Sequence, residues 1–95
     1  MIALPLSEIE PLGRVQARPW AKEITGLKID SRLVEEGDLF VAVGESGADF
    51  IPHAFARGAD AVLEPDDAHA ALAAIAGAVR RRSSAKVVAI TGSTG

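Results

Sequence analysis

Hydrophobic and polar positions along the chain follow two periods, which predict strands and helices in turn. Residues 39–43 (LFVAV) form a continuous apolar run between turn residues, which is typical of a strand buried on both faces. Alternation in residues 24–30 and the apolar runs in residues 59–63 and 86–91 predict three further strands. Residues 14–23 show no regular period, and we expect them to be irregular.

Helical spacing predicts the remaining elements. A short helix is expected over residues 5–10, a second over residues 51–58 with Gly58 as its stop, and the longest over residues 65–82. In the longest, Leu72, Ile75, Ala76 and Val79 recur at i, i+3, i+4 and i+7. The order predicts an α/β fold with a small sheet of about four strands, at least partly parallel, and two to three flanking helices.

Ligands of such sheets gather in loops at the carboxyl ends of the strands, so three loops are candidates: 30–32, 44–48 and 91–95. In the first, Asp30-Ser31-Arg32 joins an acceptor, a hydroxyl and a guanidinium, which together can read a nucleobase or ribose or hold a phosphate. The alternative is a capped turn with solvated charges. The glycines of residues 44–47 would let a ligand approach the backbone, although a plain connection is the more common case.

The last loop, Gly92-Ser93-Thr94-Gly95, has the glycine spacing of a phosphate-binding loop but lacks the lysine and the helix that follow in such loops. Taken alone, it favours a simple turn. His53 and His69 have no partner at metal-ligand spacing, so we expect both at the surface and predict no metal site. No arrangement of residues predicts a catalytic centre within the chain, and Trp20 is expected to pack against its neighbours.

Composition narrows the class of protein. The 95 residues are 48% hydrophobic and 24% charged, which suits one globular domain with a modest core. The net charge of −3 argues against a nucleic-acid or anionic-membrane partner, and the absence of cysteine excludes disulfides and thiolate metal sites. Residues 1–4 lack the features of a secretory signal, and the apolar stretch 68–79 is too short to cross a bilayer. We therefore expect a cytoplasmic monomer without membrane insertion.

Three stretches together resemble one family. "ITGLKIDSRLVEEGDLFVAV", "DFIPHAFARGADAVLEP" and "VVAITGSTG" are similar to the N-terminal region of the Mur ligases, which build the peptide stem of bacterial peptidoglycan. The resemblance implies that residues 1–85 form a domain that binds the UDP end of a UDP-N-acetylmuramoyl-peptide substrate. It also implies that residues 86–95 are the first strand and the start of the phosphate loop of a central ATPase domain.

The resemblance also implies roles for individual residues. Those expected to bind the uridine nucleotide are Ile29, Ser31, Arg32, Glu45, Ser46 and Gly47. Those expected to begin the ATP site are Gly92, Ser93, Thr94 and Gly95. The loop at 44–49 is shorter than is usual in the family and lacks the family's Asp-Gly-His or Asp-Gly-Arg. ATP and Mg²⁺ are implied for the complete enzyme, which would phosphorylate the substrate carboxylate before an amine displaces phosphate. We expect neither ATP nor Mg²⁺ as a cofactor of this chain alone, which we predict to be inactive.

Two members of the family fit the motifs. Ser93 after the first glycine favours the ligase that adds D-alanyl-D-alanine to UDP-N-acetylmuramoyl-tripeptide. The alternative is the ligase that adds the third stem residue, meso-diaminopimelate or lysine, to UDP-N-acetylmuramoyl-dipeptide. An alternative of another class is a non-catalytic module that binds a nucleotide sugar, and in a third interpretation the signature serves packing alone.

Overall fold

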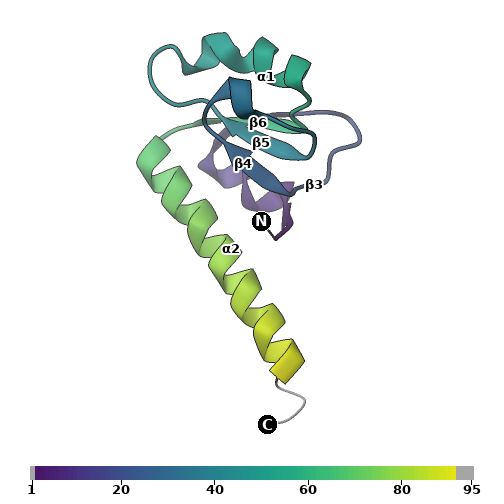
Figure 1. Ribbon diagram of the computed structural model, residues 1–95. Helices are drawn as coiled ribbons and strands as arrows, with labels where there is room; N and C mark the ends of the chain where they lie inside the picture. Colours follow the sequence, from purple (N-terminus) through teal and green to yellow (C-terminus); the bar gives the residue numbers. More distant parts are fainter. Residues whose placement is uncertain (1, 92–95) are drawn as a thin grey trace.

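The computed structural model describes the backbone of residues 2–91 and the side chains of residues 2–83. A four-stranded sheet lies at its centre, with helix α1 (Ile51–Arg57) on one face and helix α2 (Ala68–Thr91) on the other (Figure 1). The N-terminal segment lies on the same side of the sheet as α2, and α2 extends well beyond the sheet edge. The short 3-10 helices are η1 (Leu6–Glu8), η2 (Glu10–Leu12), η3 (Ser31–Leu33) and η4 (Gly47–Phe50).

The sheet has the strand order β2-β6-β5-β4. Strands β4 (Gly26–Lys28), β5 (Asp38–Val41) and β6 (Ala61–Pro65) are parallel, whereas β2 (Gly13–Ala17) pairs antiparallel with β6 at the edge. A separate two-stranded sheet joins β1 (Leu4–Pro5) to β3 (Glu23–Ile24). The expected α/β class, with a small and partly parallel sheet, is confirmed.

Strand β5 is apolar at residues 39–41, after the buried Asp38 at its start. Leu39 and Val41 face the core cluster beneath α2 and the N-terminal segment, whereas Phe40 belongs to the cluster beneath α1. All three are at most 1% exposed. Side chains of a strand point alternately to opposite faces, so in a strand covered on both sides successive residues are buried in turn on each face. The predicted two-sided burial of this strand is correct.

The N-terminal part differs from the prediction. Residues 14–23, expected to be irregular, contain most of edge strand β2, and the helix expected over residues 5–10 is replaced by η1 and η2. The strand expected over residues 24–30 is divided at Thr25 between β3 and β4. An exposed edge strand carries little periodic signal because only one of its faces is partly buried, and β2 has no fully buried residue.

The structure also differs from the prediction at the expected C-terminal strand. Residues 86–91, expected to form a strand, continue helix α2 as far as Thr91. A strand requires hydrogen bonds from a neighbouring strand, whereas a helix forms them within itself, and an alanine-rich helix propagates readily once begun. The division at residue 85 into two domains remains a prediction, and residues 92–95 lie outside the described part of the chain.

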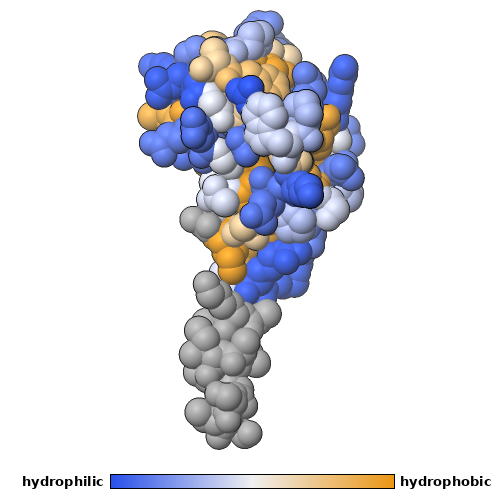
Figure 2. Space-filling view, turned by 90° about the vertical axis from the view of Figure 1, so that its right-hand side faces the viewer, coloured by the Kyte–Doolittle hydropathy of each residue, from blue (hydrophilic) through white to orange (hydrophobic). Residues whose placement is uncertain are grey.

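The length of the helices and the polarity of the surface complete the description of the fold. Within residues 2–91, no helix is both long and apolar enough to cross a membrane. On the face turned to the viewer in Figure 2, hydrophilic residues cover much of the surface, with smaller hydrophobic patches between them.

Candidate functional site

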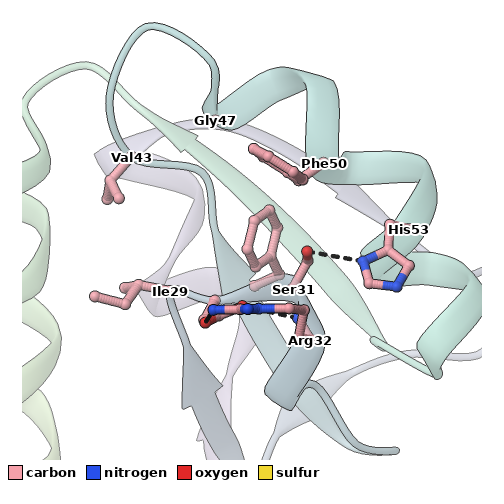
Figure 3. A pocket seen from close by; sticks show the side chains of 9 residues that line it. Ile29, Ser31, Arg32, Val43, Gly47, Phe50 and His53 are labelled. Carbon is pink, nitrogen blue, oxygen red and sulfur yellow. Dashed lines mark hydrogen bonds and ion pairs between the residues drawn. The ribbon is translucent and has the colours of Figure 1, made fainter.

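A cavity lies at the carboxyl ends of β4 and β5, on the side of the sheet that carries α1. The chain leaves β4 through residues 29–30 into η3, and it leaves β5 through residues 42–46 into η4 and α1. The cavity between these connections has a volume of about 670 Å³. Figure 3 shows its lining, which consists of Ile29, Asp30, Ser31, Arg32, Phe40, Val43, Gly47, Phe50 and His53.

Asp30 and Arg32 form a charged pair in this lining. The Asp30 carboxylate accepts a hydrogen bond from the backbone N–H of Arg32 at 2.9 Å, from its Nε at 3.1 Å and from its Nη2 at 2.8 Å. The hydrogen bonds from the Arg32 side chain, followed by the one from its backbone, lower the pKa of Asp30 to about 2. Asp30 in turn raises the pKa of Arg32. Both groups are therefore charged at neutral pH, and the guanidinium is held in place although its side chain is 81% exposed.

Ser31 and His53 meet across the cavity from two different elements. Ser31 begins η3 and is only 5% exposed, whereas His53 stands in the first turn of α1. The Ser31 Oγ and the His53 Nδ1 are 2.8 Å apart, and the two side chains point toward each other in Figure 3. The hydroxyl is thus a fixed polar group inside an otherwise largely apolar part of the cavity.

Apolar side chains provide the remaining walls. Phe40 is fully buried, while Ile29 and Phe50 are 53% and 48% exposed, although large apolar residues are usually covered. Figure 3 shows Ile29 and Val43 on one side of the cavity and Phe50 on the other. Apolar walls with a few fixed polar groups are typical of small-molecule sites, and here they suit a ligand with flat apolar faces and a polar edge.

Gly47 allows the loop after β5 to lie against the strand end. A Cβ added to this buried glycine would come within 2.8 Å of the backbone carbon of Ala42. Any larger residue would therefore push η4 away from β5, and with it the Phe50 side of the cavity. The glycine contributes to the site through this close approach of two backbone segments.

An ion pair between β4 and β5 holds the start of the η3 connection. Lys28 Nζ lies 2.9 Å from Asp38 Oδ2, and the same oxygen accepts a hydrogen bond from the backbone N–H of Glu35 at 2.9 Å. The hydrogen bond to Asp38 raises the pKa of Lys28. Through these two contacts, the buried carboxylate of Asp38 connects the end of β4 to the residues that follow η3.

The structure places four of the six residues predicted for the nucleotide in one cavity: Ile29, Ser31, Arg32 and Gly47. The other two, Glu45 and Ser46, are exposed and do not line it. The four residues predicted for the ATP loop, Gly92, Ser93, Thr94 and Gly95, lie outside the described residues. The loops at 30–32 and 44–48 therefore adjoin, as expected for two carboxyl-end connections of neighbouring parallel strands.

Sequence reasoning missed Val43, Phe50 and above all His53. His53 is exposed, as expected, but it also bonds to a predicted site residue. Its signal was its place in the first turn of the helix that follows the loop at 44–48, at the same edge of the sheet. Within the described residues, no group of three or more His, Cys, Asp or Glu side chains could hold a metal ion.

Comparison with protein families gives a match over most of the chain. The model described as "Mur ligase family, catalytic domain" matches residues 23–92. This range includes β4, η3, β5 and α1, which together form the cavity.

Two curated relatives are similar to the chain, and both are named UDP-N-acetylmuramoyl-L-alanyl-D-glutamate–2,6-diaminopimelate ligase. The protein from Streptomyces coelicolor is 45% identical over 78 residues, which cover 79% of this chain and 15% of the relative. The protein from Bacteroides thetaiotaomicron is 51% identical over 47 residues, which cover 46% of this chain and 10% of the relative. The chain thus spans only a small part of the length of these relatives, and their names agree with the ligase that the motifs placed second.

Proposed function

The chain belongs to the Mur ligase family, and we propose that it forms the domain that binds the UDP end of UDP-N-acetylmuramoyl-dipeptide in a diaminopimelate-adding ligase. The preference for diaminopimelate follows the names of the two relatives. It replaces the preference for D-alanyl-D-alanine, which depended on a single residue, Ser93, of the terminal loop.

The observation that carries the proposal is the convergence of Ile29, Ser31 and Arg32 in one cavity at the carboxyl ends of parallel strands. A uracil ring has flat faces and an edge on which an N–H lies between two carbonyl groups. Ile29 and Phe50 would contact its faces, and Ser31 would meet its edge. Arg32 stands beside this site as an exposed cation and would offset the charge of the phosphates.

In this proposal the domain binds and orients the substrate and takes no part in bond formation. The complete enzyme would use ATP and Mg²⁺ to activate the substrate carboxylate for attack by the amine of diaminopimelate. Gly92, Ser93, Thr94 and Gly95 would begin the loop for the ATP phosphates. We assign no catalytic residue to the chain and predict that it has no ligase activity on its own.

A titration of ¹⁵N-labelled protein with UDP tests the site. We expect chemical-shift changes around residues 29–32, 47 and 50–53, reached at millimolar UDP, and weaker changes with CDP because cytosine presents a different edge. Ser31→Ala should weaken binding about fivefold, which corresponds to one lost hydrogen bond. Ser46→Ala is the matched control, since Ser46 lies outside the cavity, and it should bind as the wild type does. The absence of shifts at 29–32 would overturn the assignment.

The complete reading frame distinguishes the ligase from the non-catalytic module. The ligase requires Lys and Thr directly after Gly95, and its product should contain one new amide bond per ATP hydrolysed. The complete protein is incubated with ATP and either the dipeptide substrate plus diaminopimelate or the tripeptide substrate plus D-alanyl-D-alanine. The mass of the product then identifies the added group. A protein that binds UDP-N-acetylmuramoyl-peptides but forms neither product supports the non-catalytic module.

A further inference from the structure

The contact between Ser31 and His53 has a chemical consequence for whatever enters the cavity. A serine hydroxyl has one proton to donate, and its oxygen can also accept. When the neutral imidazole accepts that proton at Nδ1, the Ser31 oxygen is left as an acceptor toward the cavity. When Nδ1 carries a proton, as in the charged imidazole and in one neutral tautomer, it donates to the oxygen instead, and the hydroxyl proton is free to turn toward the cavity. His53 therefore decides whether Ser31 offers an acceptor or a donor.

We propose that His53 is a positioning residue that holds the Ser31 hydroxyl as an acceptor for the imide N–H of a bound uracil ring. The inference rests on the proposed uridine site and adds to it the residue that sets the polarity of its central hydroxyl. Three observations support it: the 2.8 Å distance between Nδ1 and Oγ, the burial of Ser31 and the place of both residues in the cavity lining. The buried hydroxyl has little access to water, so its partner in the protein determines its orientation.

A change of pH can test the role of His53. Histidine is the side-chain type that ordinarily changes charge between about pH 5 and pH 8. Two charged groups of the η3 region, Asp30 and Arg32, line the same cavity, and Asp30 carries its charge throughout this range because its pKa is about 2. Asp49 and Arg57 stand four residues before and after His53 along η4 and α1. The His53 ring is exposed, so protons reach it from solvent.

The test uses uridine, which has no phosphate whose own charge could respond to His53. In NMR titrations of the wild type, we expect uridine to bind about fivefold more weakly at about pH 5.5 than at about pH 8, because the imide N–H loses its acceptor. 3-Methyluridine, which lacks that N–H, should bind weakly at both pH values and show no such change.

Three variants separate positioning from packing. His53→Phe keeps a ring but cannot accept a proton, so it should bind uridine about fivefold more weakly at about pH 8 and lose the pH dependence. His53→Asn retains an oxygen near the place of Nδ1, so it should bind as the wild type does at about pH 8 and also lose the pH dependence. His69→Ala removes an exposed histidine on α2 and should behave as the wild type throughout.

The outcomes distinguish this inference from the proposed function. If the wild type binds neither uridine nor UDP, the proposed uridine site is wrong, and the role of His53 fails with it. If the wild type binds both and His53→Phe binds with the same affinity and pH profile, only the role of His53 is wrong. Equal binding of 3-methyluridine and uridine overturns the imide contact. Should His53→Phe fail to fold, His53→Asn decides by its pH profile alone.

Discussion

A cavity with an arginine beside it lies at each end of the parallel strands, one at the carboxyl edge and one at the amino edge of the sheet. The two arginines make different contacts. At the carboxyl edge, Arg32 pairs with a carboxylate and has an exposed side chain. At the amino edge, a cavity of about 400 Å³ is lined by Arg18, Trp20, Glu36, Gly58 and Asp60. There Arg18 donates from Nε to the backbone oxygen of Ala59 at 2.8 Å and from Nη2 to that of Phe55 at 2.6 Å.

Arg18 is thus a structural residue that joins the end of β2 to the end of α1. Its guanidinium also stacks on the rings of Trp20 and Phe55, at 5.7 Å and 5.4 Å from their centroids. Trp20 was expected to pack against its neighbours, and it is instead 67% exposed, with this cation–π contact as its anchor. The donors of Arg18 are therefore used by the backbone, whereas those of Arg32 are paired with a carboxylate at the surface.

The largest effect is expected from Arg18→Ala. The substitution leaves the Phe55 and Ala59 carbonyl groups without a charged donor, so the free energy of unfolding should fall by about 1–3 kcal/mol. Urea unfolding measures the loss, and Arg18→Lys, which keeps one donor, should lie between. Binding of UDP should be unchanged under folded conditions. A large loss of UDP affinity with unaltered stability would show that UDP binds in the cavity at the amino edge.

Arg32→Ala should weaken the binding of UDP and leave the stability nearly unchanged, which is the reverse of Arg18→Ala. The expected change is also smaller. The dissociation constant for UDP should rise about fivefold to tenfold, while the free energy of unfolding changes by less than about 0.5 kcal/mol. Calorimetric titration measures the first quantity and urea unfolding the second. Because the substitution leaves Asp30 unpaired, the double variant Asp30→Asn, Arg32→Ala tests whether carboxylate repulsion contributes. Unchanged affinity in Arg32→Ala would remove this residue from the site.

The smallest effect is expected from acid titration of the Asp30–Arg32 pair. The pKa of Asp30 is lowered to about 2 in the folded chain from 3.8, so its stabilising contribution is present above about pH 4 and is lost as the pH falls toward 2. Asp30→Asn should therefore be slightly less stable than the wild type at neutral pH, and the difference should vanish below about pH 2. Thermal unfolding across this range measures it. A difference that does not shrink as the pH falls through 2 would contradict the ion pair as its source.

The parts of the site that could be predicted are those with a strong local signal. Ile29, Ser31 and Arg32 follow a strand directly, and Gly47 lies in the glycine-containing loop after the most apolar strand. Glu45 and Ser46 were predicted with them, but neighbours along a loop point in different directions. Their side chains do not line the cavity. His53 could not be identified because its importance lies in a contact between residues 22 apart in the sequence.

The sequence by itself determined the α/β class, strands β5 and β6, both main helices and the common edge of the sheet to which Ile29, Ser31, Arg32 and Gly47 belong. These features depend on local periodicity and on the rule that parallel strands end at one edge. Only the tertiary structure decided that β2 is a strand, that Arg18 serves the backbone and that His53 meets Ser31. Each of these depends on hydrogen bonds between segments distant along the chain, whose partners no local pattern specifies.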